Sequence, residues 1–243
     1  MITLVVVPTY DEAETIETLL RGVRAAVPHA DILVVDDASP DGTADTAEIV
    51  GKEIGGVEVL RRAGKGGLGS AYLDGFRHGL EQGAELLVEI DADLSHDPAA
   101  LPELLSAAAH GAHLVIGSRY VPGGQITGWS RRRRWLSRWG NRYVAVALGL
   151  GLNDATAGYR VYRADALRRI GLDNIRSDGY GFQIEMTYRL VKDGGRVVEI
   201  PVTFADRRYG DSKMSSRIVL EALVLVTVWG VRDVVMLRRR SLS

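Results

Sequence analysis

The chain has 243 residues, 46% of them hydrophobic and 25% charged, so it is long enough to bury one substantial core. It contains no cysteine, which excludes disulfide bonds and thiolate metal sites. Its net charge of −1 hides a strong asymmetry of charge along the chain. Met1 leads directly into an apolar run rather than into a signal peptide. We therefore expect one α/β domain with its active face in the cytoplasm.

Short β-rich runs alternate with helical patterns through the first half of the chain. The expected strands are residues 3–7, 32–35, 57–60, 86–90 and 114–117, and the expected helices lie near residues 14–26, 43–52, 68–82 and 99–109. This alternation predicts a Rossmann-like, mostly parallel sheet flanked by helices. Ligands of such sheets bind outside the carboxyl ends of the strands.

Polar clusters follow three of the expected strands at that edge. They are residues 10–12, Asp36 with Asp37, and Asp91 with Asp93. Side chains two residues apart in an extended segment point to the same side, so Asp91 and Asp93 can share one hard cation that clamps a nucleotide diphosphate. The alternative is that these residues only cap turns. Three such clusters at one edge favour a binding site.

Three further polar features are less specific. The glycine-rich residues 64–69 match neither of the usual phosphate-binding fingerprints, and we interpret them as a flexible entry into a helix, with Lys65 a candidate ligand. Residues 204–213 form a polar loop whose cations would close over a diphosphate, although a solvated loop is the alternative. His96 is interpreted as a loop residue rather than as a catalytic base.

Residues 129–150 are both basic and aromatic, and no acidic residue lies between Glu103 and Asp154. The side chains that suit a lipid headgroup region are Trp129, Arg131, Arg132, Arg133, Arg134, Trp135 and Trp139. A helix lying on the membrane surface is one interpretation of this segment. A solvated basic face with its tryptophans in the core and a nucleic-acid-binding face are the alternatives.

The C-terminal residues 218–243 predict an amphipathic helix with a basic tail. The longest uncharged piece is Ala222 to Val231, which is shorter than the ~20 apolar residues that a membrane span needs. This helix would lie in a membrane interface or be an ordinary buried helix. We therefore expect a catalytic domain over residues 1–217 and a peripheral protein without a clear transmembrane span.

Several motifs, taken in order, resemble those of the GT-A family 2 glycosyltransferases and, more narrowly, of the polyprenol (dolichyl) phosphate mannosyltransferases. The resemblance covers residues 2 to about 217. The motifs are Pro8-Thr9-Tyr10-Asp11-Glu12, residues 34–43 (VVDDASPDGT), residues 91–98 (DADLSHDP), Gly117-Ser118-Arg119-Tyr120 and Gly210-Asp211-Ser212-Lys213. Relatives often carry transmembrane helices after this domain. We expect this chain to depart from that pattern.

The resemblance implies a role for residues in each motif. Those that would bind the nucleotide sugar are Pro8, Tyr10, Glu12, Asp37, Asp91, Ala92, Asp93, Arg119, Arg207 and Lys213, and those with a catalytic role would be Asp91, Asp93, Arg119 and Lys213. Asp91, Asp93 and Ser95 would hold the metal, Mg²⁺ or Mn²⁺. Asp154 and residues 158–160 form a further family-like segment without an assigned role, and Glu185 would face the sugar or order its helix.

The implied reaction is metal-dependent, inverting transfer of mannose from GDP-mannose to polyprenyl (dolichyl-type) phosphate at the cytoplasmic membrane face. The acceptor phosphate is already anionic, so positioning and charge neutralisation can supply most of the catalysis. Alternatives are a polyprenyl-phosphate glucosyltransferase, another family 2 glycosyltransferase, a non-catalytic nucleotide-sugar-binding subunit and a nucleotidyltransferase. No residue pattern distinguishes mannose from glucose on physical grounds, and nucleic acid is not an expected partner.

Overall fold

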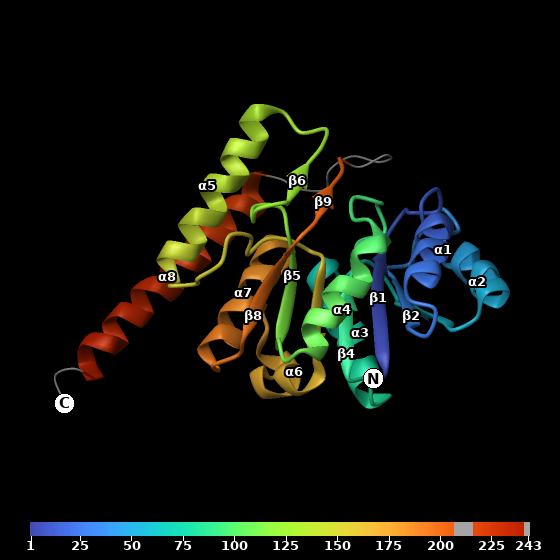
Figure 1. The fold of residues 1–243 in the computed structure, drawn as a ribbon, viewed down its shortest axis with the longest axis horizontal. Coiled ribbons are helices and arrows are strands. Elements are labelled where there is room, and N and C mark those ends of the chain that lie inside the picture. Colours follow the sequence, from blue (N-terminus) through green and yellow to red (C-terminus); the bar gives the residue numbers. More distant parts are fainter. Residues whose placement is uncertain (207–215, 241–243) are drawn as a thin grey trace.

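The computed structural model describes residues 1–206 and 216–240, the latter without the side chains of residues 216–221, 234 and 236–240. A seven-stranded sheet forms its centre, with helices on both faces (Figure 1). Its strands are β1 (Thr3–Thr9), β2 (Asp31–Asp36), β3 (Val57–Arg61), β4 (Leu86–Glu89), β5 (Leu114–Ser118), β7 (Arg160–Arg163) and β8 (Val197–Pro201). The strand order is β3-β2-β1-β4-β7-β5-β8.

The predicted, mostly parallel sheet is confirmed, with one addition. Strand β7 runs antiparallel between β4 and β5, whereas the other neighbouring pairs of this sheet are parallel. It begins at Arg160, within the segment to which the sequence assigned no role. A two-residue pairing of β6 (Gln125–Ile126) with β9 (Thr203–Phe204) lies beside the main sheet.

Helices cover the sheet in two layers. On one face are α1 (Ile16–Ala26), α2 (Thr43–Ile54) and α4 (Leu101–Ala109); on the other are α3 (Leu68–Glu81), α6 (Ala164–Ile170) and α7 (Gly179–Lys192). Alternation along β1 explains the two layers, because Val5 and Val7 pack on the first face and Leu4 and Val6 on the second.

Two more helices lie together beyond the β8 edge of the sheet. These are α5 (Arg131–Ala147) and the long α8 (Ser216–Arg240), whose C-terminal part extends away from the rest of the molecule (Figure 1). Val144, Ile184 and Val226 join α5, α7 and α8 in a third apolar cluster. None of the helices in the described ranges is long and apolar enough to cross a bilayer.

Close packing of α3 on the sheet generates a stability prediction. A methyl group at Gly75 would overlap the side chain of Val6 and lie 3.3 Å from that of Val35. Because overpacking costs roughly 1–3 kcal/mol and alanine returns at most ~1 kcal/mol of helix propensity, Gly75→Ala should lower the free energy of unfolding. Urea denaturation checks this.

The matched control is Gly140→Ala in α5, because a methyl group there meets no atom within 4 Å. That variant should be as stable as the wild type or more stable by up to ~1 kcal/mol. Equal stability of Gly75→Ala and Gly140→Ala would show that the α3 contact is not tightly packed.

Candidate active site

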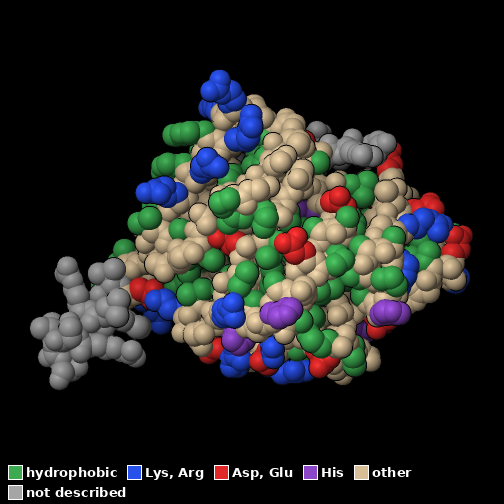
Figure 2. Space-filling model, viewed as in Figure 1, with side chains coloured by type: hydrophobic (Ala, Val, Ile, Leu, Met, Phe, Trp, Pro, Cys, Tyr) green, Lys and Arg blue, Asp and Glu red, His purple; other side chains and the backbone are tan. Residues whose placement is uncertain are grey.

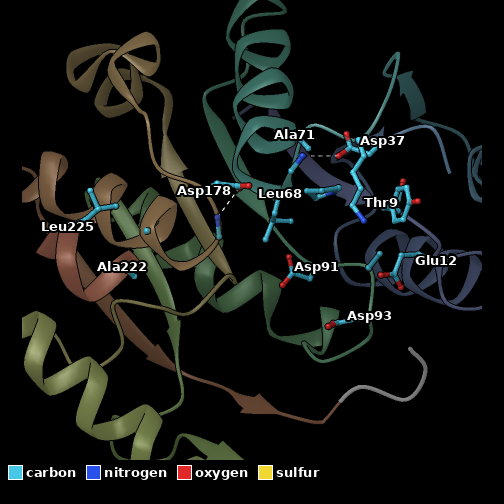
Figure 3. Close-up of a pocket in the computed structure, with 17 residues that line it drawn as sticks. Thr9, Glu12, Asp37, Leu68, Ala71, Asp91, Asp93, Asp178, Ala222 and Leu225 are labelled. Atoms are coloured by element: carbon cyan, nitrogen blue, oxygen red, sulfur yellow. Dashed lines mark hydrogen bonds between the residues drawn. The ribbon is translucent and has the colours of Figure 1, made fainter. Parts of the chain in front are cut away.

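A cavity of about 420 Å³ lies at the carboxyl ends of β1, β2 and β4 and extends to the start of α7 and to α8 (Figure 3). It is lined by Pro8, Thr9, Tyr10, Glu12, Asp37, Lys65, Gly67, Leu68, Ala71, Asp91, Ala92, Asp93, Asp178, Gly179, Gly181, Ala222 and Leu225. Seven of the residues predicted to bind a nucleotide sugar are therefore in one place: Pro8, Tyr10, Glu12, Asp37, Asp91, Ala92 and Asp93.

Hydrogen bonds between the loops that follow β1 and β2 build one wall of this cavity. The Thr9 hydroxyl donates to Asp36 over 2.8 Å, and the backbone N–H and the hydroxyl of Ser39 donate to the same carboxylate. The backbone N–H of Glu12 donates to the Thr43 hydroxyl over 3.0 Å. These bonds fix the chain on both sides of Tyr10 and Asp37, so both residues can line the cavity.

Two acidic residues from distant parts of the chain hold the glycine-rich loop, residues 64–69. Asp37 accepts the backbone N–H groups of Gly66 and Gly67 over 3.0 and 3.2 Å and pairs with Arg62. Asp178 accepts the backbone N–H of Gly69 over 2.7 Å. Lys65 consequently lies with its ammonium 3.6 Å from the centre of the Tyr10 ring. The loop expected to be flexible is thus held by hydrogen bonds at its middle and at its C-terminal end.

Asp91 and Asp93 lie in a turn, which corrects the expectation of an extended segment. Strand β4 ends at Glu89, and Leu94 within the turn has a φ of 58°. The Tyr72 hydroxyl donates to Asp91 over 2.9 Å, and Asp93 accepts the backbone N–H of Ser95 over 3.0 Å. Both carboxylates still line the cavity, because these contacts orient them in place of strand geometry.

The side chains in this turn fit a divalent metal. Within residues 1–206 and the described side chains of α8, no three carboxylate or imidazole groups gather as a complete metal site. Mg²⁺ is commonly held by one or two carboxylates with phosphate oxygens completing its shell, which matches Asp91 and Asp93 beside an open cavity. Ser95 has a buried hydroxyl oxygen without a hydrogen-bond partner, but Ser95 is not among the residues that line the cavity, so its role as a further metal ligand stays a prediction.

The segment of residues 154–160 supports the turn from below. Arg160 is fully buried and donates to the carbonyls of Ala155, Ala157 and Gln183 over 2.6–2.9 Å. A methyl group at Gly158 would lie 3.3 Å from the Asp91 carboxylate. The segment to which the sequence assigned no role therefore packs the chain closely beneath Asp91.

Arg119 is engaged inside the protein. Its guanidinium donates two hydrogen bonds of 2.6 and 2.7 Å to Asp154, and both side chains are buried. Burial opposes the charge, but the contact with Asp154 raises the pKa of Arg119 above its usual value. Arg119 is not among the residues that line the cavity, so its proposed contact with phosphate stays a prediction.

Two other residues discussed in the sequence analysis are now placed. His96 packs between Tyr159 and Phe204, and burial lowers its pKa to about 4, so the ring is neutral near pH 7. This agrees with a loop residue rather than with a catalytic base. Glu185 accepts the backbone N–H groups of Arg176 and Ser177, which orders the loop before α7. Arg207 and Lys213 lie outside the described residues.

Most of the basic and aromatic segment, residues 129–150, forms α5. Its three tryptophans differ in how far they are exposed to solvent. Trp135 and Trp139 are 65% and 48% exposed, as expected for a lipid-facing helix. Trp129 is 7% exposed and packs against Phe204 and under the guanidinium of Arg133. The expectation that Trp129 faces lipid is wrong, because its ring fills a space between β9 and α5.

The sequence analysis missed residues that line or orient the cavity from helices. Tyr72 is one apolar position among several in α3, and nothing in its spacing marks it as a partner of Asp91. Asp178 carried a signal, since an aspartate directly before a helical pattern is a typical N-cap. That signal predicts a helix start and not a cavity wall.

The Tyr72 hydroxyl provides a test of how Asp91 is held. Tyr72→Phe removes the hydrogen bond to Asp91 and should weaken Mn²⁺ binding in the presence of a nucleoside diphosphate by roughly 10-fold, as loss of a group that orients a metal ligand commonly does. Calorimetric titration measures the change. Tyr159→Phe is the control, because that buried hydroxyl donates to the Asp97 carbonyl instead. Equal affinities of the two variants would contradict the role of Tyr72.

Comparison with known proteins agrees with this geometry. Residues 4–171 match the model of glycosyl transferase family 2. The chain is 55% identical over 227 residues to the undecaprenyl-phosphate mannosyltransferase of Micrococcus luteus, covering 93% of each protein. It is 48% identical over 231 residues to the polyprenol monophosphomannose synthase of Mycolicibacterium smegmatis, covering 95% of this chain and 87% of the relative.

The fold also has solved counterparts. The glucosyl-3-phosphoglycerate synthase of Mycobacterium tuberculosis, in complex with Mn²⁺ and UDP-glucose, superposes with a TM-score of 0.66 at 19% identity, covering 93% of this chain and 77% of that one. At this identity the likeness concerns the fold alone. The family match and the two close relatives go further: the chain belongs to glycosyl transferase family 2 and is a glycosyltransferase.

Proposed function

We propose that the enzyme transfers mannose from GDP-mannose to the phosphate of a polyprenyl (dolichyl-type) lipid, with inversion at the anomeric carbon. The observation that carries the proposal is that one cavity is lined by Tyr10, Glu12 and Asp37 and also by Asp91 and Asp93. The names of the two close relatives, an undecaprenyl-phosphate mannosyltransferase and a polyprenol monophosphomannose synthase, support the choice of sugar and acceptor.

Asp91, Asp93 and Ser95 would hold Mg²⁺ or Mn²⁺. The metal would supply positive charge where the diphosphate departs. Among the described residues, Lys65 is the cation that lines the same cavity. Arg207 and Lys213, which follow β9 in the sequence and lie outside the described residues, are proposed to add further positive charge.

The chain's own residues do not need to remove a proton from the acceptor. A phosphate monoester is already anionic near neutral pH, so it can attack the anomeric carbon directly once it is aligned. His96 is buried and is not among the residues that line the cavity, which agrees with this chemistry. The protein would then act by aligning the donor with the acceptor and by excluding water.

We further propose that α5 holds the enzyme on the cytoplasmic face of the membrane as a peripheral protein. Exposed Trp135 and Trp139 suit the headgroup region, and the neighbouring arginines suit anionic lipids. An arginine of residues 131–134 would receive the acceptor phosphate. Arg133 differs from its neighbours because it pairs with Asp206 over 3.1 Å and covers Trp129.

A screen of donors against acceptors tests the proposed reaction. Purified enzyme is incubated with labelled GDP-mannose, UDP-glucose or GDP-glucose, each with polyprenyl phosphate in vesicles and with Mg²⁺, Mn²⁺ or chelator. We expect mannolipid only from GDP-mannose and only with metal. Formation of glucolipid from UDP-glucose would show that the proposed donor is wrong. Full activity in the presence of chelator would refute the proposed metal dependence.

Asp93→Asn should lower the rate of transfer by ~10²-fold or more, because it removes an anionic ligand of the metal whose positive charge would stabilise the departing diphosphate, while keeping the side chain's shape. The control is Asp97→Asn in the same loop, where an exposed carboxylate caps the short helix of residues 98–100. Initial rates at several Mn²⁺ concentrations compare the two. A wild-type rate for Asp93→Asn would refute the metal clamp.

Reversal of charge on α5 tests membrane binding. The triple variant Arg131→Glu, Arg132→Glu, Arg134→Glu spares the structural Arg133 and should release the protein from anionic vesicles, since each basic residue near such a surface contributes ~1 kcal/mol. Donor binding should persist. Vesicle co-sedimentation checks this prediction.

The matched control reverses three exposed cations outside α5, Lys52, Arg168 and Arg196, and so changes the net charge equally. Equal loss of vesicle binding in both triple variants would mean that net charge, and not α5, determines the attraction.

A further inference from the structure

One end of the cavity is mostly apolar. Beyond Asp91 the wall is formed by Gly181 of α7 and by Ala222 and Leu225 of α8 (Figure 3). Leu68 of the glycine-rich loop also lines it, and so does Asp178, whose carboxylate already accepts the backbone N–H of Gly69. A nucleoside diphosphate sugar carries hydroxyl, phosphate and base groups, so it gives no reason for such a wall. The apolar end therefore fits a different part of the reacting molecules.

An exposed apolar stripe begins beside that end. Val224, Val228, Val231 and Val235 are 54%, 56%, 59% and 45% exposed. Their spacing of four, three and four residues places them on one face of α8. Val228 lies one turn beyond Leu225 on neighbouring faces of the helix, so the stripe continues the cavity wall outward.

The opposite face of α8 is fixed to the protein. The Trp229 ring stacks on that of Tyr188 at 5.6 Å, and Asp233 pairs with Lys192 over 2.7 Å. Val226 is fully buried in the cluster with α5 and α7. The valine stripe is thus the outer surface of a helix that has already packed, and it faces away from the core.

The chemistry around the stripe indicates a bilayer. The Tyr143 hydroxyl of α5 and the Thr227 hydroxyl of α8 lie 2.7 Å apart, so the two helices are side by side. Basic side chains gather along α5 next to hydrophobic ones (Figure 2). Cationic and apolar side chains on adjoining helices complement anionic headgroups and the acyl region beneath them.

We infer that α8 forms the path by which the hydrocarbon chain of the lipid acceptor passes from the cavity into the bilayer. Ala222 and Leu225 would contact the isoprene units next to the phosphate, and the valine stripe would rest among the acyl chains. This inference rests on the proposed lipid-phosphate acceptor and adds the route of its chain. It assigns to α8 a role separate from that of the α5 arginines.

Photo-crosslinking tests the path without requiring turnover. A benzophenone amino acid replaces Leu225, Val228 or, as control, Ile49, which is an exposed apolar residue of α2. Each protein is irradiated with labelled polyprenyl phosphate in phosphatidylglycerol vesicles. We expect labelled lipid on the probes at positions 225 and 228, at least 10-fold above that on the probe at position 49.

Kinetics supply a second measurement. Leu225→Gln should raise the KM for long-chain polyprenyl phosphate by roughly 10-fold, because a buried polar group without a partner weakens the apolar contact. The KM for the donor should change by less than twofold. The variant Leu225→Met, which keeps an apolar side chain, should have the wild-type KM for both substrates. Ile49→Gln is the control and should match the wild type.

The outcomes separate the two proposals. A wild-type enzyme that transfers no sugar to polyprenyl phosphate would refute the proposed function. An active enzyme whose lipid labels positions 225 and 228 no more than position 49, with an unchanged acceptor KM for Leu225→Gln, would refute the path along α8 alone. A dimer in sedimentation that Val228→Glu dissociates would also refute it, because the stripe would then bind a second copy.

Discussion

A guanidinium with no exposed surface lies beneath the cavity, and the arrangement above it depends on how that charge is satisfied. Arg160 donates hydrogen bonds to the carbonyls of Ala155 and Ala157 and to the Gln183 carbonyl in α7. It also lies near Glu89. Burial raises the pKa of Glu89 to about 7, although the positive charge of Arg160 lowers it. A buried charge is tolerated only when its hydrogen bonds are made. These bonds fix residues 155–158 against the turn that contains Asp91.

The position of Arg160 beneath the cavity depends on the antiparallel strand β7. It enters the sheet between β4 and β5 and begins at Arg160, so the residue arrives at the end of the sheet where the parallel strands finish. The cavity consequently has two origins. Loops within the first 93 residues form its polar end, and α7 and α8 form its apolar end.

Much of the polar end could be predicted from sequence, because it consists of short motifs at strand ends. Tyr10, Asp37 and Asp93 each follow an apolar run, and parallel topology then gathers them. The rest depends on tertiary contacts. Strand β7 has only four residues without a clear alternating pattern, Tyr72 reaches Asp91 from within an apolar helix face, and Trp129 is buried by β9, which forms from residues 75 positions later.

The carboxylate of Asp37 has a consequence for ligand selection. An ionised carboxylate offers about four acceptor positions. Arg62 takes one on Oδ1, and Gly66 and Gly67 take two on Oδ2. A single further donor can therefore be accepted, on Oδ1. A ligand that presents two donors there would have to displace a backbone N–H of the glycine-rich loop, so the number of donors that a ligand offers to Asp37 is coupled to the position of Lys65 over Tyr10.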